Sequence, residues 1–122
     1  MRCLIVEMDP IFSEMLCDKI ESLGHSATRA RTVQDAKPLL QKGLLDIVMF
    51  DHAMQDAQIM RLTRLKDTLC PGAKMIKLTD CEMLPDRSGV RLAPALAQVL
   101  AAPTAPIAQR PGPLAAAIAW LT

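Results

Sequence analysis

Short apolar runs alternate along the chain with longer segments that carry apolar residues at helical spacing. Residues 3–6 form a continuous apolar run, and residues 44–50 contain the strongest one. Such runs are typical of strands that are buried on both faces of a parallel sheet. Residues 74–79 alternate polar with apolar positions, and weaker strand signals lie at 26–30 and, between prolines, at 104–110. The pattern therefore predicts five strands.

Helices are predicted between these strands, because apolar residues recur there every three or four positions. The first predicted helix follows Pro10 and stops at Gly24, and the second begins at Thr32 with the spacing of a capping box. Pro38 lies inside the second helix and should kink or shorten it. Further helices are expected at 59–69, 94–100 and 114–121, and residues 80–89 are expected to form a loop.

The order of these elements is strand then helix, repeated five times. This order predicts an α/β fold with a parallel five-stranded sheet, helices on both faces and right-handed connections. The expected strand order is 2-1-3-4-5, the doubly wound flavodoxin-like arrangement, in which ligands bind beyond the carboxyl ends of the strands. With 122 residues, the chain is expected to form a single domain, residues 1–122.

Composition excludes several classes of partner. The formal net charge is +1 with no basic stripe, and only three residues are aromatic, so nucleic acid is not an expected partner. The apolar run at 3–6 is too short for a signal peptide and is followed at once by Glu7 and Asp9. No apolar run approaches the roughly 20 residues that span a bilayer. We therefore expect a cytoplasmic protein that does not enter the membrane.

The four cysteines, Cys3, Cys17, Cys70 and Cys81, form no CxxC pair and have no histidine at ligand spacing. A zinc site is therefore not expected. Reduced thiols, mostly buried, are the simpler interpretation.

The residues that directly follow the predicted strands lie where a ligand would bind. They are Glu7, Met8 and Asp9 after the first strand, Asp51 after the third, Thr79 and Asp80 after the fourth, and Arg110 and Pro111 after the fifth. The segments LIVEMDP, DIVMFDHAM, KLTD and QRP carry these residues at spacings similar to those of bacterial response regulators. Over nearly its whole length the chain resembles the receiver domains of two-component signalling.

The resemblance implies a specific site. In receiver domains, acids after the first and third strands hold Mg²⁺. The acid after the third strand also accepts a phosphoryl group from a phosphohistidine on a partner kinase. By motif, Asp51 matches the phosphoacceptor and Glu7 the first acid, so that Glu7 and Asp51 are the candidate metal ligands. Thr79 and Arg110 match the residues that contact phosphate, with Arg110 in the place of a lysine. Arg110 could instead form a standing ion pair with an acid of the site.

Other positions depart from the family pattern. Met8 replaces the second acid, and a thioether is a poor ligand for Mg²⁺, which makes bound Mg²⁺ doubtful. Asp9 could substitute for it, although strand alternation would aim Asp9 elsewhere. Asp80 stands where a small neutral residue is usual, and Ile107 stands where many receivers carry a switch aromatic. These changes favour a protein without conventional phosphorylation.

The last third of the chain has an unusual composition, since Arg91 and Arg110 are the only charged residues from 90 to 122. An exposed apolar patch is therefore predicted, used for homodimerisation or partner docking. Its residues would be Leu92, Leu96, Leu100, Ile107, Leu114 and Ile118.

Two functional hypotheses follow. The first is an atypical receiver-like domain that signals by binding a kinase, a phosphotransfer protein, an output regulator or itself, without Mg²⁺-dependent phosphorylation. The alternative is a phosphoacceptor modified on Asp51. Metal-dependent hydrolysis of phosphate esters would need a second metal carboxylate and a nucleophile with its base, so no enzymatic activity is expected.

Overall fold

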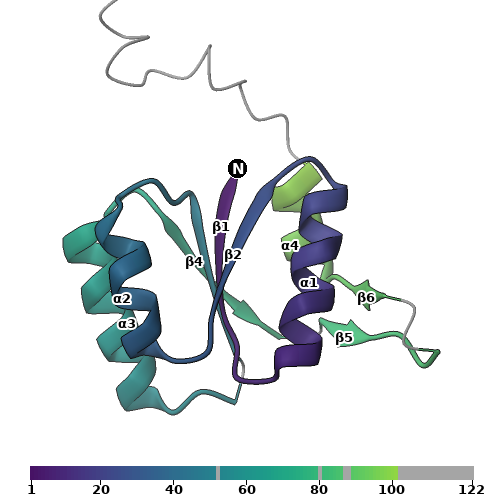
Figure 1. Cartoon of the computed structure of the whole chain (residues 1–122), viewed down its shortest axis with the longest axis horizontal. Coiled ribbons are helices and arrows are strands. Elements are labelled where there is room, and N and C mark those ends of the chain that lie inside the picture. The colour runs from purple at the N-terminus through teal and green to yellow at the C-terminus, as the bar shows by residue number, and fades with distance from the viewer. Residues whose placement is uncertain (52, 80, 87–88, 102–122) are drawn as a thin grey trace, which may run out of the picture.

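The computed structural model describes residues 1–51, 53–79, 81–86 and 89–101, which form an α/β domain around a parallel sheet (Figure 1). The sheet has four strands in the order β2-β1-β3-β4. Its strands are β1 (Arg2–Val6), β2 (Ser26–Ala30), β3 (Ile47–Asp51) and β4 (Lys74–Leu78). The helices are α1 (Pro10–Ser22), α2 (Val33–Gln41), α3 (Asp56–Leu69) and α4 (Pro94–Ala101). The α/β class and the relative order of these four strands are as predicted.

Both faces of the sheet are covered, because β1 and β3 are buried on each side. Cys3 and Ile5 of β1 face α1 and α4, whereas Leu4 and Val6 face α2 and α3. The two helix pairs accordingly form separate layers on either side of the sheet (Figure 1). This explains why the central strands read as continuous apolar runs rather than as an alternating pattern.

The predicted helix boundaries have identifiable causes. The Asp9 carboxylate accepts the N–H groups of Ile11 at 3.0 Å and Phe12 at 3.2 Å, and so caps α1. The Thr32 hydroxyl accepts the N–H of Asp35 at 3.1 Å and caps α2. Gly24 and Gly43 follow the two helices with φ of 90° and 67°, a conformation that glycine adopts at little cost. Pro38 lies within α2, which runs only from Val33 to Gln41.

Two segments differ from the prediction. The expected loop at 80–89 contains strand β5 (Glu82–Met83), which pairs antiparallel with β6 (Val90–Arg91). Arg91 and Glu82 form an ion pair across this hairpin. The predicted strand at 44–50 starts later, at Ile47, and the Asp46 carboxylate just before it accepts the N–H of Arg2 at 2.8 Å.

Helix α4 is a core element on the same face as α1. Leu96 and Leu100 are 1% and 3% exposed and pack in the cluster that contains Leu16 and Ile20. The prediction that these two leucines belong to an exposed interaction patch is therefore wrong, since the apolar side of α4 covers the sheet. Leu92 is half-buried against the same cluster.

The position of α4 also bears on the expected fifth strand. A right-handed connection from β4 to a strand beyond it would place the helix with α2 and α3, but α4 lies with α1. The predicted strand at 104–110 and the predicted helix at 114–121 lie outside the described residues. The count of five strands thus stays a prediction.

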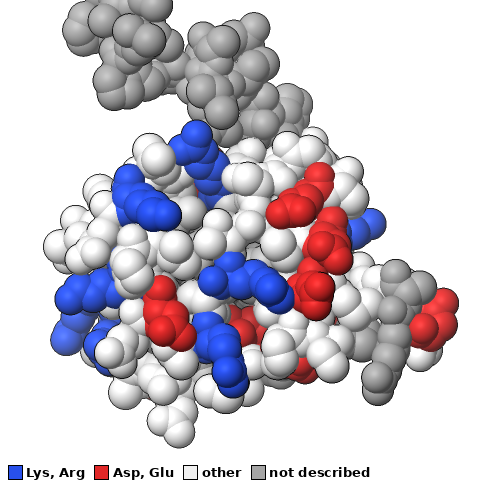
Figure 2. All heavy atoms as spheres, viewed as in Figure 1, with Lys and Arg blue, Asp and Glu red and all other residues white. Residues whose placement is uncertain are grey.

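Charges of both signs are exposed on the face shown in Figure 2. Acidic side chains gather over α1, whose exposed residues include Glu14, Asp18 and Glu21, and basic side chains are spread over the middle and the opposite side. Within the described ranges, no helix has the length and apolar character needed to cross a membrane.

Candidate functional site

The register of the sheet brings the predicted site residues to one edge. Val6 of β1 pairs with Phe50 of β3, so Glu7 comes level with Asp51. Asp51 in turn pairs with Leu78, the last residue of β4, and the exposed Thr79 directly follows Leu78. Three of the residues predicted from strand ends are therefore neighbours at the carboxyl edge of the sheet.

Glu7 is the buried member of this group, with an exposed fraction of 7%. Burial raises the pKa of Glu7 from 4.5 to about 7, and the negative charges of Asp51 and Asp9 and a side-chain hydrogen bond with Asp51 raise it further. The N–H of Asp9, which donates to Glu7 Oε1 at 3.1 Å, acts in the opposite direction. The protonated form of Glu7 is therefore favoured by its burial and by the neighbouring carboxylates.

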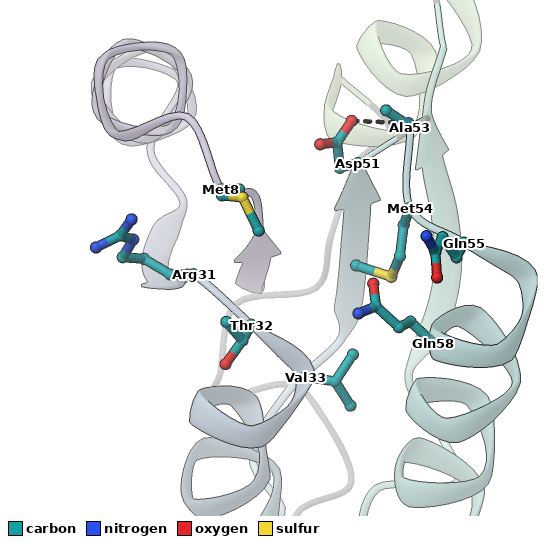
Figure 3. Close-up of a pocket in the computed structure, with 9 residues that line it drawn as sticks. All are labelled: Met8, Arg31, Thr32, Val33, Asp51, Ala53, Met54, Gln55 and Gln58. Carbon is teal, nitrogen blue, oxygen red and sulfur yellow. Dashed lines mark hydrogen bonds between the residues drawn. The ribbon is translucent and has the colours of Figure 1, made fainter.

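Asp51 is held in place by the turn that follows β3. Its Oδ1 atom accepts the N–H of Ala53 at 2.9 Å, drawn as a dashed line in Figure 3, and its carbonyl accepts the N–H of Met54 at 3.1 Å. The side chain is half-buried and borders a hollow of about 310 Å³ that is also lined by Glu7, Asp9, Phe12, Cys81 and Glu82. Asp51 is therefore oriented by hydrogen bonds and still reachable from solvent.

Met8 belongs to a different surface from Glu7. Alternation along β1 places residue 7 on the α1 face and residue 8 on the α2 and α3 face. The Met8 side chain is 61% exposed and lines a second hollow, which it shares with Arg31 and Met54 (Figure 3). The position of the missing acid thus contributes a sulfur atom and no oxygen ligand.

Asp9 is engaged as the cap of α1 through its two hydrogen bonds to Ile11 and Phe12. Moving this carboxylate to a metal would leave these two N–H groups without their acceptor. The idea that Asp9 replaces the missing acid therefore carries an energetic cost.

The donor set is a poor fit for Mg²⁺. The resemblance implies Glu7 and Asp51 as ligands, but Met8 adds no oxygen atom and the Asp9 carboxylate caps α1, whereas Mg²⁺ needs an octahedral shell of oxygen atoms. In the part of the chain that the structure describes, no group of three or more His, Cys, Asp or Glu residues could hold a metal ion. We therefore derive no chemical step through a metal.

Several site predictions fall on other parts of the chain. Arg110 and Ile107, and Asp80 beside Thr79, lie outside the described residues. Sequence reasoning had overlooked the second hollow, to which Arg31, Thr32 and Gln58 contribute. A signal was present, since Arg31 and Thr32 directly follow the second strand at the edge where ligands bind.

The chain matches no protein-family model, and no curated protein is detectably similar to it in sequence.

Proposed function

We propose that this chain is a receiver-like signalling domain that acts by binding a protein partner, without Mg²⁺-dependent phosphorylation of Asp51. The partner would be a kinase, a phosphotransfer protein, an output regulator or a second copy of the chain, and the site of action would be the cytoplasm. The resemblance of the strand-end segments to receiver domains supports the signalling role, and the strand order β2-β1-β3-β4 agrees with it.

The side chains available around Asp51 are the observation that carries the proposal. In a site built for Mg²⁺, several carboxylate oxygen atoms surround the cation and their charge is offset by it. Here Met8 supplies no oxygen atom, the Asp9 carboxylate caps α1, and burial disfavours the charged form of Glu7. The described residues therefore offer few free oxygen ligands beside Asp51.

The finer topology belongs to the same proposal. In the five-stranded order, residues 104–110 would pair with the outer edge of β4, which has no partner strand among the described residues. A strand reached from α4 would make a left-handed connection, which is rare. The five-stranded order 2-1-3-4-5 thus remains a proposal that would require this rare connection.

A phosphorylation assay tests the proposed function. The purified chain is incubated with a small acyl phosphate donor and Mg²⁺, and its intact mass is measured. We expect no acid-stable, alkali-labile mass increase. The alternative phosphoacceptor function predicts such an increase, which would be lost in Asp51→Asn and retained in the control Asp56→Asn, whose carboxylate lies exposed at the start of α3.

The interaction face is proposed on sequence grounds. Since Leu96 and Leu100 are core residues, the remaining candidates are the half-buried Leu92 and three residues outside the described ranges, Ile107, Leu114 and Ile118. We expect Ile118→Asp to dissociate a homodimer in sedimentation experiments. A chain that is monomeric at every concentration would contradict self-association through residues 90–122.

A further inference from the structure

A second hollow of about 300 Å³ opens between β1 and β3 on the side of α2 and α3. This is the point where the strand order reverses, because β2 lies on one side of β1 and β3 on the other. Crevices at such a point, beyond the carboxyl ends of the strands, are the usual ligand sites of open α/β sheets. The hollow is at the small end of the range for ligand sites and would admit a ligand of about one nucleotide.

Two methionines form opposing sides of this hollow. Figure 3 shows Met8 at the end of β1, across the space from Met54, whose side chain descends from the turn after β3. Met8 is 61% exposed and so contributes little to the core. Thioethers make favourable contacts with aromatic rings and adapt to their shape. The two side chains could hold a planar ring between them.

Two glutamines supply hydrogen-bonding groups beside Met54. Gln55 and Gln58 lie on the α3 side of the hollow, and both are exposed (Figure 3). Gln55 occupies the cap position of α3 without a hydrogen bond from its side chain to the helix. A primary amide offers a donor and an acceptor together, which is the pairing that the edge of a nucleobase presents.

Arg31 provides a positive charge at the opposite side. Its guanidinium group points away from Asp51 in Figure 3, and it forms no ion pair with another of the described residues. Arg31 directly precedes Thr32, the cap of α2, where the N–H groups of Val33 and Gln34 have no acceptor within the helix. Guanidinium and helix N–H groups together suit a phosphate.

We propose that this hollow binds a nucleoside monophosphate, with the base between Met8 and Met54, its edge at Gln55 and Gln58, and the phosphate at Arg31. Asp51 also lines the hollow, at the end of β3, whereas Arg31 lies across it beside α2 (Figure 3), so a phosphate at Arg31 is placed away from the Asp51 carboxylate. The proposal goes beyond the proposed signalling role and does not depend on whether Asp51 is phosphorylated.

The methionines allow a direct test, because the chain has eight of them and each methyl group can be labelled for NMR. AMP and GMP are titrated into the full chain, and the methyl signals are followed. We expect saturable shifts of Met8 and Met54, with no comparable shift of Met60, which is 55% exposed on α3 and does not line the hollow.

Matched variants locate the two ends of the ligand. Arg31→Gln should weaken AMP binding at least tenfold and leave the weaker binding of adenosine unchanged, whereas Arg61→Gln on α3 should change neither. Met8→Ala should weaken AMP and adenosine alike, and Met60→Ala should weaken neither. Circular dichroism and thermal unfolding establish that each variant is folded.

Three results would overturn the proposal. They are the absence of any methyl shift at millimolar AMP and GMP, equal shifts at Met60 and Met8, and AMP binding that is insensitive to Arg31→Gln. None of these results affects the phosphorylation assay, so failure of nucleotide binding is distinguishable from failure of the signalling proposal.

Discussion

The carboxyl groups of Glu7 and Asp51 hydrogen-bond to one another across the carboxyl ends of β1 and β3. The pairing follows from the register, which aligns Val6 with Phe50, and from strand alternation, which turns both acids toward α1. Met8, the position at which the resemblance to receiver domains implies another acid, faces the other side of the sheet.

The raised pKa of Glu7 makes stability depend on pH. Between its ordinary value of 4.5 and about 7, the folded protein holds a proton that the unfolded chain has released, so stability falls as pH rises through this window. Above pH 7 the full penalty, about 3 kcal/mol, is present. We expect Glu7→Gln to change the free energy of unfolding more favourably at pH 8 than at pH 5. Urea unfolding at the two pH values measures this difference.

Glu14→Gln is the matched control for this measurement, because Glu14 is an exposed acid on α1. Its effect on the free energy of unfolding should be the same at both pH values. A Glu7→Gln difference that is also constant between pH 5 and pH 8 would show that Glu7 ionises normally in the folded chain.

Met8→Asp should create a cation site. The new carboxylate would lie in the hollow that Met8 shares with Asp51, and Asp51 also borders the hollow that contains Glu7. A second carboxylate beside Asp51 would add oxygen ligands of the kind that Mg²⁺ prefers. We expect Mg²⁺ to raise the melting temperature of Met8→Asp and to leave the parent chain unchanged. At a hundredfold excess over the dissociation constant, the gain would be about 2.7 kcal/mol.

Met60→Asp is the control for Met8→Asp, since it adds the same charge at an exposed methionine of α3 that lines neither hollow. Equal stabilisation of both variants by Mg²⁺ would reflect general screening of negative charge and not a site. Stabilisation of the parent chain itself would contradict the poor fit that we describe for Mg²⁺.

Sequence reasoning succeeded where local chemistry decides the structure. The cap at Thr32 and the glycine stop at Gly24 are local features, and strands β1 and β3 are apolar because both of their faces are buried. These features are readable from neighbouring residues.

The sequence was less informative where distant elements meet. The apolar side chains of Leu96 and Leu100 suit a core face as well as an exposed patch. Only the packing of α4 on α1 distinguishes these two locations. The short hairpin of β5 and β6 has too few residues to give a periodic signal. For the site, strand ends predicted that Glu7 and Asp51 would be neighbours, but the raised pKa of Glu7 depends first on its burial in the fold.

Removal of the α1 cap should cost a moderate amount of stability. Asp9→Ala deletes the acceptor for the N–H groups of Ile11 and Phe12, and a lost cap typically costs about 1 kcal/mol. Asp9→Asn retains an acceptor oxygen and should lose less. Urea unfolding at pH 7 measures both variants, and equal losses would show that the carboxylate charge, rather than its hydrogen bonds, stabilises the helix.

The burial of α4 predicts a large effect for a truncation in its apolar side. Leu96 is 1% exposed and packs with Leu16 and Ile20, so Leu96→Ala should destabilise the chain by about 2–5 kcal/mol, measured by urea unfolding. Gln98→Ala is the control, because Gln98 is exposed on the same helix and alanine keeps its helical propensity. Its effect should be small. A loss below about 1 kcal/mol for Leu96→Ala would indicate that this leucine lies on a surface. It would then belong to the proposed interaction face, as the composition of residues 90–122 predicts.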